Sequence, residues 1–184
     1  MCPGGEIIIA SSEQGGVVTN GMSYNARNGN YANSALLVDV RTSDFENDDP
    51  LAGLEFQRKY EAIAYEKGNG YNAPSVRWKD FNGSDVEKCL PKFAAESIIE
   101  AMPHLGKKLK GFDGKHAVMK AVETRSSSPV RIIRDKQKMM SNITGLYPAG
   151  EGAGYAGGIV SSAVDGMKVA EAMGRRYYQK GDIS

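Results

Sequence analysis

Apolar and polar residues alternate in three short runs near the start of the chain, at residues 6–11, 16–19 and 34–40. Alternation with a period of two is typical of a half-buried β-strand, because successive side chains of a strand point to opposite faces. Turns rich in glycine and asparagine, such as NGN at residues 28–30, separate the runs. The first 40 residues therefore predict an antiparallel β-meander.

Two helical patterns follow this region. Apolar residues recur at helical spacing across residues 51–65, and Gly68 ends the pattern. The second pattern covers residues 91–102, where a proline suits the first turn of a helix and Pro103 marks the end. The chain between the two helices, residues 71–81, predicts an extended conformation.

The C-terminal third predicts a hairpin, a further strand and one long helix. Two apolar-rich runs, VMKAVETR at residues 118–125 and VRIIRD at residues 130–135, flank a Ser-Ser-Ser-Pro turn and predict a β-hairpin. A third extended run, at residues 142–149, leads into a glycine-rich turn and an amphipathic helix. The polar tail, residues 175–184, is expected to be frayed. One face of the helix carries Ile159, Ala163, Met167, Ala170 and Gly174.

These elements predict an α+β or mixed α/β fold in two parts. The composition changes near Gly114, where charged, helical sequence gives way to extended and glycine-rich sequence. Residues 1–114 predict an antiparallel β-rich lobe with helices, and residues 115–184 predict strands that end in the long helix. The sequence contains no internal repeat and no low-complexity linker.

Composition limits the partners of the chain. With 23 Lys and Arg against 22 Asp and Glu, the formal net charge of +1 provides no field that would attract nucleic acid or an anionic membrane. No window reaches the roughly 18 uncharged apolar residues of a membrane span, and the N-terminus lacks the pattern of a signal peptide. A cytoplasmic location is therefore expected. The two cysteines, Cys2 and Cys89, and the two histidines are too few for a disulfide framework or a zinc site.

Glycine is the unusual feature of the composition, with 22 of 184 residues, or about 12% against a usual ~7%. Residues 152–157 (GAGYAG) match the pattern G-x-G-x-x-G between a predicted strand and a helix. Glycine at this place lets the backbone turn tightly and lets a ligand approach the main chain, while free amides at the helix start favour electron-rich atoms. A phosphate or a carbonyl oxygen is the expected guest.

A Rossmann βαβ unit that binds an ADP moiety does not explain this turn. Such a unit needs a second parallel strand with an acidic residue about 20 positions after the glycines. The residues after the helix are too few and too polar to supply that strand. The turn must therefore contact another part of a ligand, or the rest of the fold is missing. In a third reading glycine serves only close packing of helix and strand, against which Glu151 and the density of glycine argue.

Three segments of the chain resemble bacterial FAD-dependent dehydrogenases of the two-dinucleotide-binding-domain flavoprotein superfamily. The segment NITGLYPAGEGAGYAGGIVSSAVDGMKVAEAM, residues 142–173, is similar to their C-terminal FAD-contacting segment. The segments CPGGEIIIASSEQGGVVTNGMSYNARNGNYANSALLV, residues 2–38, and ETRSSSPVRIIRD, residues 123–135, resemble the same family. The resemblance implies a flavoprotein oxidoreductase with FAD as its cofactor.

The resemblance also implies roles for individual residues. In such families a strand ends in a Gly-Glu or Gly-Asp pair whose acid bonds the ribityl or ribose region, a role that would fall to Gly150 and Glu151 here. The next helix directs its N-terminus at the flavin pyrimidine ring and the pyrophosphate. By position, that role falls to Gly152, Ala153, Gly154, Tyr155, Ala156 and Gly157.

Family members of this kind are longer and carry an ADP-binding G-x-G-x-x-G fingerprint ahead of the CPGG segment. That portion is absent here, so the chain is expected to be a C-terminal fragment without the N-terminal FAD-binding half. Residues 1–114 would then form most of an inserted substrate or cap domain. Residues 115–184 would be the last strands and helix of a Rossmann-like FAD- and NAD(P)-binding domain. Alone, the fragment is expected to bind FAD weakly or not at all, to be inactive and to self-associate.

Arg125 and Arg131 flank the predicted hairpin turn, in which Ser127 lies. A hairpin loop could present these guanidinium and hydroxyl groups to an anionic substrate or to the flavin edge. The same arginines could instead pair with nearby carboxylates. No catalytic side chain is identified, because neither His104 nor His116 has a visible acid–base partner.

The leading hypothesis is therefore the C-terminal part of a FAD-dependent oxidoreductase that acts on a small-molecule substrate, with NAD(P)H or another electron partner. A second hypothesis is a self-contained module that binds an anion or a phosphorylated metabolite at the glycine-rich helix start, without redox chemistry. A third is a structural interaction domain in which the glycines only allow packing. Binding of anions without flavin separates the second hypothesis from the first. A glycine variant separates the third from both, because it would change stability and no ligand affinity.

Overall fold

The computed structural model describes residues 3–180, and their contacts divide the chain into two compact units. Unit 1 comprises the residues up to 48 together with residues 55–124, and unit 2 comprises residues 49–54 together with the chain from residue 125. The fold is a small α+β arrangement with two small antiparallel sheets, which confirms the α+β prediction. The assignment of the two parts to a cap domain and a FAD-binding domain remains a prediction.

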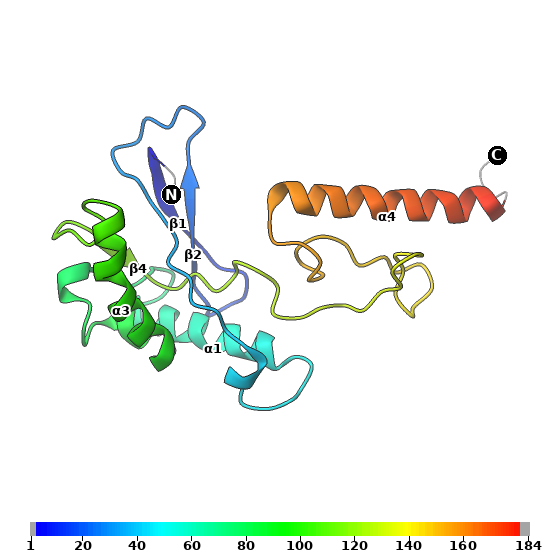
Figure 1. Cartoon of the computed structure of the whole chain (residues 1–184). Helices are drawn as coiled ribbons and strands as arrows, with labels where there is room; N and C mark the ends of the chain where they lie inside the picture. Colours follow the sequence, from blue (N-terminus) through cyan, green and yellow to red (C-terminus); the bar gives the residue numbers. More distant parts are fainter. Residues whose placement is uncertain (1–2, 181–184) are drawn as a thin grey trace. The chain divides into compact units, whose positions relative to one another are not determined.

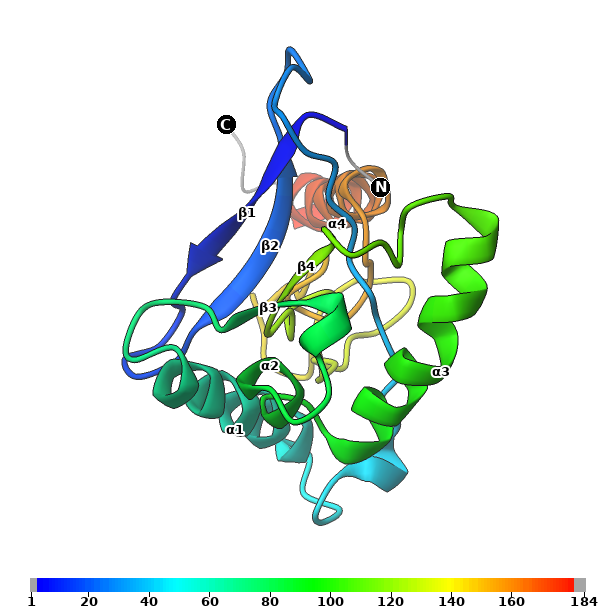
Figure 2. The same cartoon turned by 90° about the vertical axis from the view of Figure 1, so that its left-hand side faces the viewer.

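Unit 1 begins with a β-hairpin (Figure 2). Strands β1 (Gly5–Ala10) and β2 (Val18–Ser23) pair antiparallel, with Gly5 opposite Ser23. The first two predicted strands are thus confirmed, although the second strand is longer and lies slightly later than expected. The three consecutive isoleucines of β1 favour a strand because β-branched side chains suit extended backbone.

The third predicted strand, at residues 34–40, does not form, so the meander prediction is wrong beyond its first hairpin. Just before it, the side-chain amide of Asn33 donates hydrogen bonds to the carbonyl oxygens of Glu6 at 3.0 Å and Met22 at 2.8 Å. Apolar side chains of the run pack partly buried against the core of unit 1. Burial in that core takes the place of strand pairing for these residues.

The two helices predicted from periodicity are both present (Figure 2). Helix α1 (Ala52–Lys67) ends where expected, before Gly68. Helix α3 (Lys92–Lys108) starts where expected but continues through Pro103, so the predicted end before this proline is wrong. The proline removes one backbone hydrogen bond, whereas the extra helical turn keeps Leu105 packed against the core. Burial of apolar surface outweighs the local signal of the proline.

The second sheet pairs β3 (Ser75–Arg77) with β4 (Val118–Lys120), again antiparallel. The sequence predicts that the segment of β4 forms a hairpin with residues 130–135, and this prediction is wrong. β4 finds its partner earlier in the chain, and just after β4 the Val122 carbonyl accepts the Thr19 amide at 2.7 Å. The β-propensity of a segment does not specify its partner strand, so the tertiary structure determines which strand it pairs with.

The core of unit 1 gathers around Phe81 and Cys89, which are 1% and 0% exposed. The Trp78 ring packs on Phe81, with ring centroids 5.5 Å apart. Trp78 begins a 3-10 turn (Trp78–Asp80), and Phe81 follows this turn directly. The short helix α2 (Asp85–Lys88) comes next. Only residues 75–77, in the middle of the predicted extended run at residues 71–81, therefore form a strand.

A buried polar cluster ties the end of unit 1 to α1. The Thr124 hydroxyl donates to Glu61 Oε1 at 2.6 Å, and Gln57 Nε2 donates to the Thr124 carbonyl at 2.8 Å. The Val17 amide donates to the Glu61 carbonyl at 3.1 Å. Buried polar groups are stable only when hydrogen-bonded, so this cluster fixes the path of the chain up to Thr124.

Cys89 is expected to be unreactive in the folded protein. Burial raises the pKa of its thiol to about 11, and the thiolate is the reactive form. With Cys2, which lies outside the described residues, replaced by serine, a thiol reagent at pH 8 should label the native chain slowly and the urea-unfolded chain at once. Because the unfolded thiol ionises first, stability should fall as the pH rises above about 8.5. Immediate labelling of the native chain would contradict this burial.

From residue 125 onward, the described part of unit 2 consists of irregular chain and α4 (Ile159–Lys180), and the irregular chain lies along the helix (Figure 1). Within the described residues no strand forms at 130–135 or 142–149, so these two predicted strands are wrong. A turn interrupts the second run at Gly145, whose φ is +89°. The predicted fraying of residues 175–184 is wrong as far as Lys180, and residues 181–184 lie outside the described range.

Helix α4 buries a different face from the one that its apolar pattern favours. Ile159 and Met167, on the predicted apolar face, are 92% and 65% exposed. The packed face instead carries Val169 and Ala172, which are 6% and 7% exposed, and the largely buried Asp165. A charged side chain faces inward here because it has a partner in unit 2, described below.

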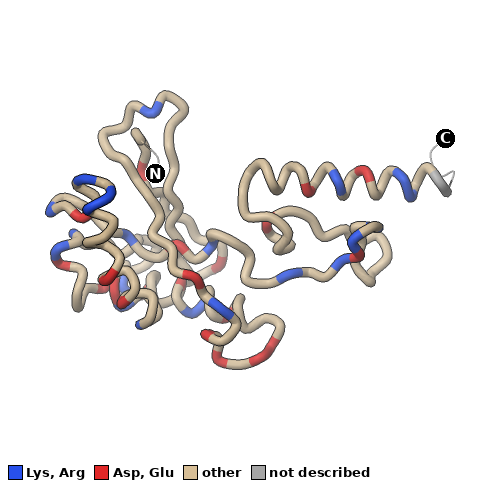
Figure 3. The backbone as a smooth tube through the Cα atoms, in the orientation of Figure 1, with Lys and Arg blue, Asp and Glu red and all other residues tan. Residues whose placement is uncertain are grey.

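Charged residues of both signs are interspersed along the described chain (Figure 3). None of the helices within residues 3–180 combines the length and apolar character needed to span a bilayer. Over the same residues, no three His, Cys, Asp or Glu side chains are grouped so that they could hold a metal ion.

Candidate functional site

The glycine-rich turn of unit 2 is held by its own backbone hydrogen bonds. The Gly154 amide donates to the Glu151 carbonyl at 2.8 Å, and the Tyr155 amide donates to the Gly150 carbonyl at 3.0 Å. Gly150 and Gly154 have φ angles of +69° and +80°, a region that glycine adopts without strain. The turn therefore uses two of its glycines to build its own shape.

Gly154 is also required by its surroundings. A Cβ at this position would lie 2.5 Å from the Val130 carbonyl oxygen and 3.0 Å from Arg131 Cα. Both are backbone atoms, which cannot move aside as the end of a flexible side chain can. Packing within the chain alone thus accounts for this glycine, and a contact of Gly154 with a cofactor stays a prediction.

Gly152 and Gly157 differ from Gly154 in this respect. A Cβ at either position would meet no atom within 4 Å, and neither residue has a positive φ. Nothing in the described chain requires glycine at these two positions. Open space beside an α-carbon is what a ligand needs in order to approach the main chain closely.

The start of α4 offers backbone amides that have no acceptor in the described part of the chain. The Gly158 amide donates to Ser161 Oγ at 3.1 Å, whereas the amides of Gly157, Ile159 and Val160 have no such partner there. Amides in the first turn of a helix lack intrahelical acceptors and carry partial positive charge. The side chains of Ile159 and Val160 are 92% and 76% exposed. This end of α4 can therefore donate hydrogen bonds to ligand oxygens beside an apolar surface.

A buried ion pair connects the glycine-rich turn to α4. Arg134 Nη2 and Nη1 donate to the two carboxylate oxygens of Asp165 at 2.5 and 2.9 Å, and the two side chains are 6% and 13% exposed. Asp165 Oδ2 also accepts the Gly150 amide at 2.9 Å, and Arg134 Nη1 also donates to the Pro148 carbonyl at 2.6 Å. The pair thus holds both the chain that enters the turn and the helix that follows it.

The ring and hydroxyl of Tyr155 belong to the same network. The guanidinium carbons of Arg134 and Arg131 lie 3.7 and 5.1 Å from the centre of the Tyr155 ring. The Tyr155 hydroxyl accepts the Arg134 amide and donates to the Ile132 carbonyl, both at 3.0 Å. Arg131 Nε donates to the Gly154 carbonyl at 2.8 Å. Tyr155 is therefore engaged by unit 2 itself.

The ion pair stays charged over the whole range in which a protein is normally handled. Hydrogen bonds from Arg134 hold the pKa of Asp165 at about 2 against the opposing effect of burial, with help from the Gly150 amide. The same hydrogen bond raises the pKa of Arg134 above its usual range. The contacts of Asp165 with the turn and with Arg134 are therefore constant near neutral pH.

Two further polar side chains lie at the turn. Ser162 Oγ, in the second helical turn of α4, is buried without a hydrogen-bond partner among the described residues. A Cβ at Gly150 would lie 3.8 Å from Ser162 Cβ, which places this hydroxyl next to the turn. Glu151, the predicted ribityl or ribose ligand, is partly buried. A buried hydroxyl without a hydrogen-bond partner is costly.

The structure does not gather Arg125, Ser127 and Arg131 on one hairpin loop, because that hairpin is absent. Arg131 binds the Gly154 carbonyl and contacts Tyr155, so it positions the turn. Ser127 is exposed, and Arg125 is exposed with an interaction of its own. A role of the three residues toward a substrate remains a prediction.

Arg134 and Asp165 are the site residues that the sequence analysis missed. The pattern placed the first in an extended run and the second on a polar face of the last helix. A charged residue within an apolar run such as VRIIRD was the available signal. Their partnership spans 31 residues of chain, and no local pattern specifies it.

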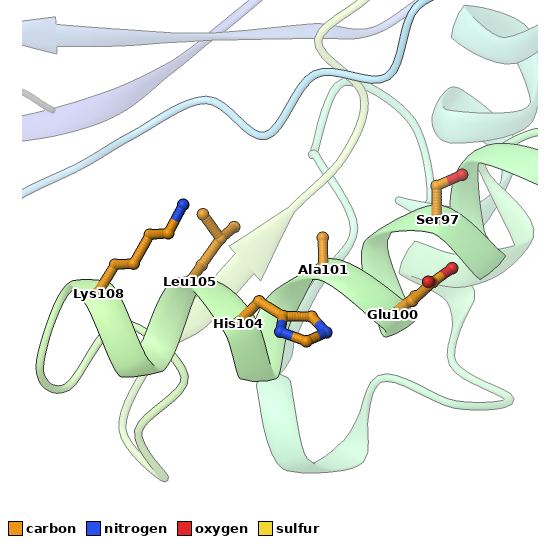
Figure 4. Close-up of a pocket in the computed structure, with 6 residues that line it drawn as sticks. All are labelled: Ser97, Glu100, Ala101, His104, Leu105 and Lys108. Atoms are coloured by element: carbon orange, nitrogen blue, oxygen red, sulfur yellow. The ribbon is translucent and has the colours of Figure 1, made fainter.

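An open hollow on unit 1 lies along one face of α3 and does not resemble an active site. Figure 4 shows His104 between Glu100 and Lys108 along the helix, but the histidine is exposed and no hydrogen bond joins it to Glu100 among the described contacts. The structure therefore adds no support for a catalytic histidine. The lining residues are Ser97, Glu100, Ala101, His104, Leu105 and Lys108.

Comparison with known proteins gives two findings. Residues 1–126 match the model of a family described as FAD-dependent protein, C-terminal domain-like. The chain is also 44% identical, over 192 aligned positions, to a protein of Clostridium beijerinckii that carries the name Uncharacterized protein. That alignment covers 93% of this chain and 36% of the relative, so the chain spans about a third of the relative's length.

Proposed function

Because the chain belongs to the family described as FAD-dependent protein, C-terminal domain-like, we propose that it is the C-terminal part of a FAD-dependent oxidoreductase. In this proposal the start of α4 contacts the flavin of the complete protein. The family match covers residues 1–126 and supports a flavoprotein. The dehydrogenase chemistry and the Rossmann-like context are the finer part of the proposal, and they rest on the resemblance of residues 142–173.

The observation that carries the proposal is the group of amides without chain acceptors at the start of α4. The flavin pyrimidine ring presents carbonyl oxygens, which accept hydrogen bonds, so the amides of Gly157, Ile159 and Val160 suit it. The space beside Gly157 would let the ring approach the main chain. The exposed side chains of Ile159 and Val160 would offer the ring an apolar surface.

The residues proposed to bind the cofactor fall into two groups, those whose amides are already hydrogen-bonded within unit 2 and those whose α-carbons face open space. The amides of Gly150, Gly154 and Tyr155 are already bonded within unit 2, so we assign these residues to the shape of the turn. Gly152 and Gly157, with open space at their α-carbons, are assigned to cofactor contact. The carboxylate of Glu151 keeps its proposed role toward the ribityl or ribose hydroxyls.

When bound, FAD supplies the hydride or electron transfer, and the chain binds and orients it. Unit 1 contains most of the residues of the family match, and we assign the substrate side of the protein to it. A small-molecule substrate, and NAD(P)H or another electron partner, remain part of the proposal. Because the chain spans about a third of its relative, it should bind FAD weakly by itself.

The test is the variant Gly157→Val in the natural polypeptide at its full length. Its side chain would enter the open space beside the amides without meeting the rest of the chain. The unchanged protein should purify yellow, and the variant should bind FAD at least about tenfold more weakly, a loss of about 1.4 kcal/mol. Fluorescence titration with FAD, together with urea unfolding of both apoproteins, measures affinity and stability separately.

Gly174→Val is the matched control, because its Cβ also meets open space but lies on α4 far from the helix start. It should leave the affinity for FAD unchanged. Equal affinity of Gly157→Val and the unchanged protein would contradict the proposal, as would a full-length protein that binds no FAD. Saturable binding of inorganic phosphate without any flavin would instead favour the anion-binding alternative.

A further inference from the structure

Four separate segments of unit 2 meet at one point beside the glycine-rich turn. Arg134 comes from the irregular run before the glycine-rich turn, and Pro148 and Gly150 come from the chain that enters the turn. Tyr155 lies at the end of the turn, and Asp165 lies in the second helical turn of α4. The carboxylate of Asp165 accepts three hydrogen bonds, two from Arg134 and one from Gly150. The guanidinium group links Asp165, the Pro148 carbonyl and the Tyr155 ring.

We propose that Arg134 and Asp165 form a clasp that sets the orientation of the glycine-rich turn relative to the start of α4, and that they act as positioning residues for cofactor binding. The role toward the cofactor rests on the proposed function. The clasp itself rests only on contacts within unit 2.

The geometry of the clasp explains why a charged pair occupies this place. Asp165 lies six residues after the first residue of α4, and its contact with the Gly150 amide joins the helix to the beginning of the turn. Arg134 closes the other side through the Pro148 carbonyl and the Tyr155 ring. A planar guanidinium can make these contacts simultaneously, which an ammonium group cannot. The amides of Gly157, Ile159 and Val160 have no acceptor in the turn or elsewhere among the described residues.

A clasp of this kind predicts a different result from an ordinary stabilising ion pair. An ordinary pair affects the stability of unit 2 as a whole. A positioning pair fixes one local conformation, so its loss should be detected first at the turn. The Gly154 amide is the best reporter, because its acceptor is the Glu151 carbonyl and neither clasp residue bonds to it.

The experiment uses Asp165→Asn and Arg134→Lys. In Asp165→Asn, an NH2 group replaces one carboxylate oxygen and cannot accept the hydrogen bond that this oxygen accepts. In Arg134→Lys, an ammonium group replaces the planar guanidinium group. Amide hydrogen exchange of the 184-residue chain without flavin should accelerate at Gly154 by about tenfold or more, while the Ala172 amide in the middle of α4 and the Thr19 amide in unit 1 keep their rates. Equal acceleration at Gly154 and Ala172 would show an ordinary stabilising ion pair and overturn the clasp. In the full-length protein both variants should bind FAD about tenfold or more weakly.

Glu46→Gln is the matched control, because it removes an exposed ion pair with Lys59, whose side chains are 76% and 51% exposed. It should change neither exchange at Gly154 nor FAD affinity. Unchanged exchange at Gly154 in both clasp variants overturns the clasp, whatever the cofactor does. Faster exchange with unchanged FAD affinity overturns its role toward the cofactor. A full-length unchanged protein without FAD overturns the proposed function, and the exchange result then judges the clasp alone.

Discussion

Replacing Gly154 by valine should destabilise unit 2 by about 2–4 kcal/mol, the range of a severe backbone substitution. The φ of +80° is unfavourable for any residue with a Cβ, and most so for a β-branched one. The added Cβ would also lie 2.5 Å from the Val130 carbonyl oxygen. Urea unfolding followed by circular dichroism, to which α4 contributes together with α1 and α3, measures the effect.

Gly152→Val is the control for Gly154→Val. Gly152 lies in the same turn, but its φ is not positive and a Cβ there meets nothing within 4 Å. Its unfolding free energy should stay within about 0.5 kcal/mol of the unchanged chain, as for most surface substitutions. Equal stability of the two valine variants would show that the described turn is not the native one.

This difference decides how the glycine-rich turn is to be tested for function. Loss of FAD in a Gly154 variant would have two explanations, because the substitution also damages the turn. Gly157 offers the cleaner test, since no part of the described chain occupies the space of its Cβ. The residues of a single glycine motif thus serve two purposes, the shape of the turn and access to the main chain.

Phe81→Ala should reduce the stability of unit 1 by about 3–5 kcal/mol, the usual cost of deleting a fully buried phenylalanine. Phe81 is 1% exposed, and its ring packs on Trp78 with 5.5 Å between centroids. The resulting cavity would lie between the 3-10 turn and the rest of the core. Trp78 is the only tryptophan of the sequence, so its fluorescence during urea unfolding reports on this core directly.

Tyr31→Ala is the aromatic control for Phe81→Ala. Tyr31 is 78% exposed, so its removal should change stability by no more than about 0.5 kcal/mol. If Phe81→Ala cost as little as Tyr31→Ala, the described core of unit 1 would be wrong.

The candidate site was only partly readable from the sequence. The glycine-rich turn was found because glycine is conspicuous and stands directly before a strongly periodic helix. Arg134 and Asp165 were missed because each looks ordinary in its own segment, and only contact across 31 residues makes them a pair. Arg131 was found, and the structure shows that it binds the Gly154 carbonyl in the absence of the expected hairpin loop. Its role toward a substrate stays a prediction.

The sequence by itself determined the elements whose cause is local. The first hairpin, α1, the start of α3 and α4 follow from alternation, helical periodicity and glycine or proline at their ends. Likewise, the resemblance to flavoproteins lies in contiguous segments and agrees with the family match.

Only the tertiary structure decided which edge β4 pairs with, whether α3 continues past Pro103 and which face of α4 is packed. It also separated the glycines that shape the turn from those that leave it open. Each of these outcomes depends on a partner distant in sequence. Burial and hydrogen bonding with such a partner contribute more free energy than the local preference they override.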